Sequence, residues 1–233
     1  RKLYLIENCI YGVDIQPIAV QIAKMRFFIS LVVDQRIDRK ADNLGIRPLP
    51  NLETKFVAAN TLIGIEKPAQ QMLRNPQIDA KEMNLKEVRN NHFSARTPST
   101  KAKWRELDTK LRAEISALLK ADGFPRETTE KLANWNPYDQ NASADFFDPE
   151  WMFGMLEGFD IVIRNPPYIT LALGRQRNVL SEEQVRQYRE LYPGLTEYKG
   201  NTFSMFIGFG TNVTSHLFGP SFSVRRYWRK VGR

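Results

Sequence analysis

Cysteine and histidine are nearly missing from this sequence of 233 residues, which has one cysteine and two histidines. Cys9 has no second cysteine with which to form an internal disulfide, and no cysteine or histidine stands at metal-ligand spacing from it. We therefore expect a buried thiol rather than a redox or metal site. The histidines, His92 and His216, stand alone in the sequence, and we assign neither of them a role.

Long apolar runs are missing as well. The longest uncharged apolar run, Phe27 to Val33, is far too short to cross a bilayer, and the first residues do not follow the order of a signal peptide. We therefore expect a cytoplasmic protein with no membrane partner. Because the first residue is Arg1 rather than methionine, we also expect the chain to begin inside a longer polypeptide. With 42% hydrophobic residues, it can still bury the core of one large α/β domain or two small ones.

Acidic residues are absent from the last part of the chain, Phe203 to Arg233, which carries five positive residues. This tail supplies more than half of the net charge of +8. An excess of positive charge favours a polyanion as partner, but here it is concentrated in the tail. Net charge therefore gives only weak support for nucleic-acid binding by the rest of the chain.

The apolar residues that are present indicate a strand, an acidic turn, a buried helix and a second strand. From Pro17 to Val33 they recur at helical spacing, and Pro17 suits the first position of a helix. The runs Ile10 to Val13 and Lys55 to Ala58 are short and apolar, as strands are. The helix is expected to bury a broad face made of Ile18, Ile22, Met25, Phe28, Ile29, Val32 and Val33.

The segment from Glu66 to Lys131 is highly charged, with helical patterns near Ala80 to Phe93 and Thr100 to Ala121. We interpret it as an antiparallel helical insertion packed on the main domain, because the second stretch carries a narrow apolar stripe. The stripe consists of Trp104, Leu107, Leu111, Ile115 and Leu118. The alternative is a DNA-contacting arm, although charged helix faces are usually only solvated. Its interleaved cations would be Lys101, Lys103, Arg105, Lys110 and Arg112.

The next part of the chain, Trp135 to Gly158, is rich in Asn, Asp, Pro and aromatic residues and predicts a loop. It leads into a strand predicted over Asp160 to Ile163. Further on, Ser181 is suited to begin a helix, because acids follow it in the first turn, and this helix is expected to reach about Leu191.

The predicted strand ends in Asn165, Pro166, Pro167 and Tyr168. An exocyclic amino group of adenine or cytosine is a poor nucleophile, because its lone pair is delocalised into the ring. A site that methylates it should accept both N–H hydrogens, and the Asn165 side-chain oxygen and the Pro166 carbonyl can do so on a loop that both prolines stiffen. Tyr168 offers an aromatic face to an extruded base, a stack worth about 1 to 3 kcal/mol.

In this setting "FDIVIRNPPYI" resembles the catalytic motif of amino-group methyltransferases that use S-adenosylmethionine. The stretches "IYGVDIQPIAVQIAKMRFFISL", "LPNLETKFVAANTLIG" and "YDQNASADFFDPEWMFG" resemble the adenine-specific DNA methyltransferases of Type IIG restriction-modification enzymes and related large phage-defence methyltransferases. The resemblance covers about Leu3 to Asn201. It implies an α/β fold, a partial Rossmann-like sheet with a helical insertion, and ligands at the carboxyl ends of the strands.

The resemblance also implies which residues contact the cofactor. Asp14 would hold its ribose hydroxyls, with Ile15 beside it. Asn60 would lie near its adenine, with Leu62 or Ile63 packed beside that ring. Asn165, Pro166, Pro167 and Tyr168 would hold and stack the target adenine. No metal is expected.

Three departures from the family pattern stand out. The glycine-rich loop expected about 20 residues before the ribose acid is absent, because the residues before Asp14 contain only Gly12. Arg164 stands where a small residue is usual. From about Phe203 the family's helix and turn are replaced by a basic sequence, for which we hypothesise a frameshifted or truncated gene. Reading the coding DNA in its other frames tests this hypothesis.

We accordingly predict an incomplete methyltransferase core at 1–65 and 132–202, a helical insertion at 66–131 and an atypical tail at 203–233. The predicted function is methyl transfer from S-adenosylmethionine to a flipped adenine of double-stranded DNA, by a fragment of a longer protein with restriction or specificity domains. The alternatives are a protein-glutamine methyltransferase, since a side-chain amide presents a similar planar nitrogen, and a non-catalytic remnant.

Overall fold

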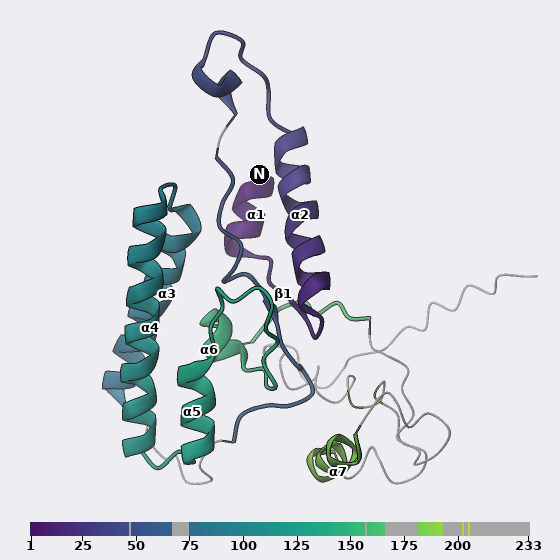
Figure 1. The fold of residues 1–233 in the computed structure, drawn as a ribbon, viewed down its shortest axis with the longest axis vertical. Coiled ribbons are helices and arrows are strands. Elements are labelled where there is room, and N and C mark those ends of the chain that lie inside the picture. Colours follow the sequence, from purple (N-terminus) through teal and green to yellow (C-terminus); the bar gives the residue numbers. More distant parts are fainter. Residues whose placement is uncertain are drawn as a thin grey trace, which may run out of the picture.

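The computed structural model describes residues 1–46, 48–66, 75–156, 158–165 and 181–192, together with Thr202 and Met205. Its elements are α1 (Lys2–Asn8), β1 (Gly12–Asp14), α2 (Pro17–Val33), a 3-10 turn η1 (Asp42–Gly45), β2 (Phe56–Ala58), α3 (Pro76–Ser94), α4 (Pro98–Ala121), α5 (Arg126–Asn134), α6 (Pro149–Phe153) and α7 (Glu182–Leu191) (Figure 1). The fold is mixed α/β, as the sequence predicts.

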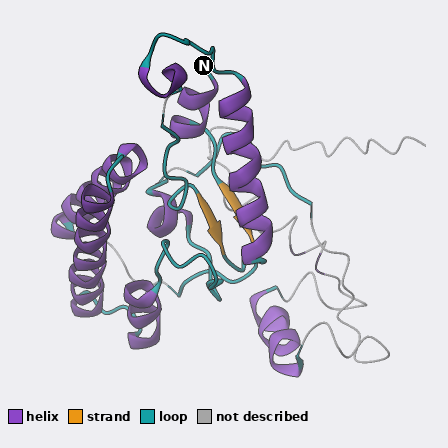
Figure 2. Ribbon diagram, turned by 45° about the horizontal axis from the view of Figure 1, so that its top comes forward, coloured by secondary structure: helices purple, strands orange, loops and turns teal. Residues whose placement is uncertain are grey.

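The sheet consists of β1 and β2, which pair in parallel with Val13 opposite Val57. Side chains alternate across a strand, so neighbouring residues of β2 face different helices. Phe56 packs in a cluster with Val20 of α2, whereas Val57 belongs to a larger cluster with residues of α3 and α4. Figure 2 shows the two strands between α2 on one side and the α3–α4 pair on the other. Both predicted strands and the helix between them are confirmed.

A third segment reaches the sheet at the end of β2. Ala59 and Ala144 form an isolated parallel bridge, in which Ala144 N–H donates to the Ala58 carbonyl and Asn60 N–H donates to the Ala144 carbonyl, both at 2.9 Å. Ala59 N–H points the other way and donates to the Asp14 carbonyl of β1, also at 2.9 Å. The chain therefore leaves the sheet after Ala59 and returns beside the same point at Ala144.

Helices α3 and α4 confirm the two helices predicted within the charged segment. Both begin earlier than their apolar patterns, because each has a capped start with proline in its first turn. Asn75 accepts a hydrogen bond from Gln77 N–H at 3.0 Å, and Thr97 forms a reciprocal capping box with Thr100. The predicted apolar stripe of α4 also holds, since Leu111 and Ile115 are buried in the core. Trp104, Leu107 and Leu118 pack against it.

A buried ion cluster joins this helical pair to its neighbours. The Asp108 carboxylate accepts from Arg89 Nε at 2.9 Å and from Arg112 Nε at 2.6 Å. Arg89 also donates through Nη1 to the carbonyls of Trp151 and Met152, at the end of α6. Two of the five cations named for a DNA-contacting arm therefore have partners within the protein. Arg112 pairs with buried Asp108, and Arg105 pairs with Glu53 at 3.4 Å.

The predicted burial of α2 is wrong, although its bounds agree. The face expected to be buried is largely exposed, with Ile18 at 64% exposure, and only Val20, Lys24 and Leu31 are buried. The exposed apolar side chains are Ile18, Ile22, Met25, Ile29, Val32 and Val33. The helix is apolar around most of its circumference, so spacing alone does not select the face that meets a narrow sheet.

Three further expectations also need correction. Cys9, which caps the end of α1, is exposed rather than buried. The predicted loop of 135–158 contains the short helix α6, whose start is capped when Asp148 accepts from Trp151 N–H at 2.7 Å. Residues 160–163 form no strand, and Ile163 is 92% exposed. A strand needs a hydrogen-bonded neighbour, and none of the described residues provides one there.

Helix α7 confirms the helix predicted from Ser181 to Leu191, with a capping box between Ser181 and Gln184. His216 and most of the predicted tail lie outside the described residues. Among the helices that the structure describes, none has the length and apolar composition needed to cross a bilayer.

Candidate functional site

The carboxyl ends of β1 and β2 bring two of the predicted site residues to one edge of the sheet. Asp14 ends β1, opposite Ala58, and Asn60 follows β2 by two positions. The hydrogen bond from Ala59 N–H to the Asp14 carbonyl fixes these two strand ends side by side. The edge formed by the carboxyl ends of parallel strands is where α/β proteins bind ligands.

The Asp14 carboxylate is exposed and shapes the turn into α2. Its Oδ1 accepts a hydrogen bond from Gln16 N–H at 2.8 Å, and Gln16 is the residue that precedes the helix. Such a side-chain bond to the backbone two residues on is an Asx turn. Ile15, the residue inside this turn, is exposed. The local sequence therefore gives Asp14 a structural task and at the same time presents its carboxylate to solvent beside the strand ends.

Asn60, in contrast, is only 9% exposed, and both ends of its amide are engaged. Its Oδ1 accepts from Leu62 N–H at 3.1 Å, and its Nδ2 donates to the Tyr188 hydroxyl of α7 at 3.1 Å. A ligand at the Asn60 amide group would therefore compete with Tyr188 or use the second N–H of Nδ2. The sequence did not predict this contact, because the two residues are 128 positions apart.

Leu62 lies under α7 rather than open to a ligand. It is buried in a small cluster with Val185, Tyr188 and Met205. Tyr192, just after α7, donates its hydroxyl hydrogen to the Leu62 carbonyl at 2.8 Å. Helix α7 thus covers the loop that follows β2, and the two predicted adenine neighbours are partly enclosed by it.

Of the residues predicted to hold the target base, only Asn165 lies in the part of the chain that the structure describes. Asn165 is described and exposed, and the hydrogen bonds of the Asp14 and Asn60 side chains go to other residues. Pro166, Pro167 and Tyr168 lie outside the described residues. In the parts of the chain that are described, no three His, Cys, Asp or Glu side chains gather as a metal site.

A second set of polar residues lies at the opposite, amino ends of the strands, and the sequence analysis missed it. Lys55 directly precedes β2 and is only 6% exposed. It donates from Nζ to the Tyr11 hydroxyl at 3.2 Å, and burial, with the nearby Lys86 charge, lowers the pKa of Lys55 to about 8. The sequence does contain a signal for this site, since Lys55 directly precedes an apolar strand. Lysine is rarely buried at such a position unless nearby groups accommodate its ammonium group.

Comparison with known proteins finds a family whose model matches most of the chain and one relative of a shorter part. The model of the Eco57I restriction-modification methylase family matches residues 8–219. A protein of Methanocaldococcus jannaschii, named as a type II restriction enzyme and methyltransferase, is 43% identical over 64 residues. Those residues make up 28% of this chain and 5% of the archaeal protein, so the chain matches only a small part of that relative's length. No solved structure matches the chain.

Proposed function

Because the chain belongs to the Eco57I restriction-modification methylase family, we propose that it transfers a methyl group from S-adenosylmethionine to the exocyclic amino group of adenine in DNA. We propose further that it does so as part of a larger restriction-modification or phage-defence enzyme. The family match over residues 8–219 is the observation that carries this proposal. The shared strand edge of Asp14 and Asn60 supports it independently, since such an edge is a usual ligand site in α/β folds.

The cofactor, when bound, supplies an electrophilic methyl group. The exposed Asp14 carboxylate suits the ribose end, because it can accept hydrogen bonds from two hydroxyl groups while one of its oxygens also holds the Gln16 turn. Asn60 would recognise the adenine end through the second N–H of its Nδ2, or through the one that now donates to Tyr188.

The target base would be held by the Asn165 to Tyr168 motif. The Asn165 side-chain oxygen and the Pro166 carbonyl would accept the two amino hydrogens, which draws the nitrogen toward tetrahedral geometry and directs its lone pair to the methyl group. Tyr168 would stack on the flipped base. The amino proton released after transfer goes to solvent, so this scheme needs no strong base in the protein. Residue 165 is exposed, which leaves it accessible to a nucleic acid.

The experiment is a methyl-transfer assay with labelled S-adenosylmethionine and duplex DNA, comparing Asn165→Ala with the unaltered chain. We expect the variant to lower the rate about 100-fold or more, as the loss of a group that acts in the transition state does. Asn84→Ala, at an exposed asparagine of α3, is the matched control and should keep full activity.

Three outcomes contradict the proposal. Transfer to glutamine of a protein substrate instead of DNA would assign the motif to protein methylation. Calorimetry that detects no binding of S-adenosylmethionine would identify a non-catalytic remnant. Equal rates of methyl transfer in Asn165→Ala and Asn84→Ala would show that the Asn165 to Tyr168 motif takes no part in the reaction.

A further inference from the structure

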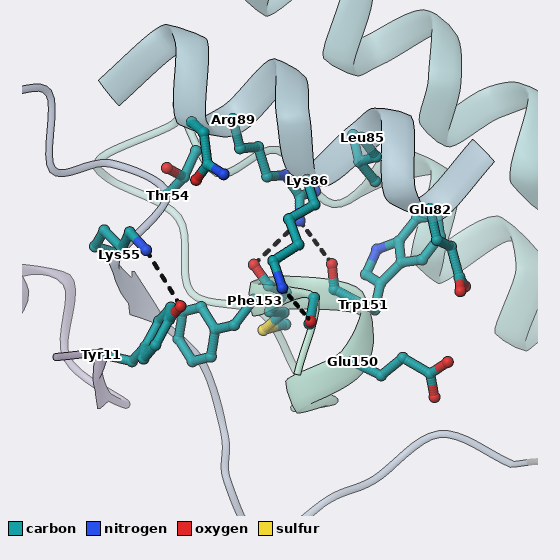
Figure 3. Close-up of a pocket in the computed structure, with 13 residues that line it drawn as sticks. Tyr11, Thr54, Lys55, Glu82, Leu85, Lys86, Arg89, Glu150, Trp151 and Phe153 are labelled. Carbon is teal, nitrogen blue, oxygen red and sulfur yellow. Dashed lines mark hydrogen bonds between the residues drawn. The ribbon is translucent and has the colours of Figure 1, made fainter. Parts of the chain in front are cut away.

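A small pocket lies at the amino ends of the strands, on the opposite edge from Asp14 and Asn60. Figure 3 shows that it is enclosed by α3, by α6 and by the residues that directly precede β1 and β2. The polar side chains that face it include Tyr11, Thr54, Lys55, Lys86, Arg89 and Trp151. Most of these side chains donate hydrogen bonds, and three of them are cations.

Two buried donors in the lining are left without acceptors. Arg89 is 7% exposed, and its Nε and Nη1 are engaged by Asp108 and by the α6 carbonyls, but its Nη2 has no partner within the described part of the chain. Trp151 Nε1 is likewise buried without an acceptor among those residues. An unpaired buried donor is costly and uncommon, and more so when it carries charge, so both groups call for an acceptor that the described residues do not supply.

The charge around the pocket has the same sign as the unpaired donors. Lys55 and Lys86 both line it, and their mutual repulsion adds to burial in lowering the pKa of Lys55. The single carboxylate of Asp108 pairs with the guanidinium groups of both Arg89 and Arg112, so this ion cluster has a net charge of about +1. Glu82 and Glu150 also line the pocket, but Figure 3 shows their carboxylates beyond Trp151 and directed away from the two lysines.

We propose that this pocket binds a small oxyanion, with a phosphate group as its ligand class. Lys86, which touches only the Gly154 carbonyl at 3.5 Å in the described structure, would turn its ammonium group to the anion from the open side. Lys55, Arg89 Nη2 and Trp151 Nε1 would donate from the buried side. Several charge-assisted donors from different elements are the usual arrangement for an oxyanion. The site is separate from the strand edge proposed for methyl transfer and does not depend on that assignment.

The test is calorimetric titration of the full chain with inorganic phosphate at constant ionic strength. We expect saturable binding that Lys86→Gln weakens about tenfold, because a charge-assisted hydrogen bond is lost. Lys110→Gln, at an exposed lysine of α4, is the matched control and should bind phosphate as the unaltered chain does. Lys55→Gln, with folding checked by circular dichroism, should weaken binding as well.

A second arm distinguishes the source of the phosphate group. Competition by a short DNA duplex for the phosphate site would assign the pocket to the nucleic-acid backbone, and lack of competition would assign it to a free oxyanion. Absence of saturable phosphate binding, or equal affinity of Lys86→Gln and Lys110→Gln, would overturn the proposal.

Discussion

At the scale of single residues, His92 is an interior residue of the helical pair. It is fully buried, its Nε2 accepts from Arg105 Nε at 3.3 Å, and its ring lies 4.8 Å from that of Tyr138. Burial lowers the pKa of His92 below its usual range, and Arg105 lowers it further, while Glu53 opposes the shift. The sequence assigned His92 no role, and burial of this imidazole depends on partners that the sequence does not reveal.

His92 should make the stability of the fold depend on pH. In the unfolded chain His92 binds a proton near about pH 6.5, whereas in the folded chain its pKa is lower. The contribution of His92 to the free energy of unfolding is therefore fully present above that pH and decreases as the pH falls below it. Urea unfolding at about pH 7.5 and about pH 5.5 should show this loss in the unaltered chain. His92→Gln should show a smaller difference, whereas the control Asn84→Ala, at an exposed residue of α3, should show the same difference as the unaltered chain. An unchanged difference in His92→Gln would contradict the assignment.

At the scale of elements, α2 shows where apolar spacing is informative and where it is not. Its first and last residues follow from Pro17 and the apolar run, since a helix start and length are local properties. Its buried side is a tertiary property. Val20 and Leu31 are buried in one cluster with Phe56 of the sheet, while the more numerous apolar residues on the other side remain exposed.

Substitutions on the two sides of α2 should differ in cost. Val20→Ala removes buried methyl groups beside Phe56 and should lower the free energy of unfolding by about 1 to 2.5 kcal/mol. Ile22→Gln, on the exposed side, should change it by less than about 0.5 kcal/mol. Chemical denaturation measures both. A large loss in Ile22→Gln would mean that this face is covered in the folded chain.

The two predicted strands and the 160–163 segment illustrate the same division. Gly12 to Asp14 and Phe56 to Ala58 form strands because each lies beside the other in parallel register. "DIVI" has similar strand-forming composition, but Ile161 and Ile163 are exposed, since composition supplies no neighbour. For the candidate site, the positions of Asp14 and Asn60 at the ends of two strands could be predicted from the sequence, whereas the cover that Tyr188 places on Asn60 could not.

At the scale of the whole molecule, Asp108 connects several elements at once. Its partners Arg89 and Arg112 bring α3 and α4 together, Arg89 reaches the end of α6, and Arg112 donates from Nη1 to the Ala133 carbonyl of α5 at 2.8 Å. Burial pushes the pKa of Asp108 upward, but the two arginines together outweigh it and hold that pKa below its usual range. The carboxylate is therefore ionised in the folded chain.

Asp108→Asn should destabilise the fold strongly, because it leaves two buried guanidinium groups without their anion. We expect a loss of about 3 to 5 kcal/mol in the free energy of unfolding. Glu130→Gln is the control, since it removes only an exposed pair with Arg126, which solvent screens, and should cost far less. Thermal and urea unfolding of both variants measure the difference, and equal losses would show that Asp108 does not connect these elements.

The bridge between Ala59 and Ala144 has a consequence for how such a chain can change during evolution. The intervening segment starts and ends at neighbouring points, so residues can be gained or lost within it while the spacing of the strands stays the same. Its side chains nevertheless share one core with Val57 and Phe146, so wholesale exchange of the segment requires a partner surface of matching shape. The segment between Ala59 and Ala144 should therefore accept changes in its length more readily than changes in its buried residues.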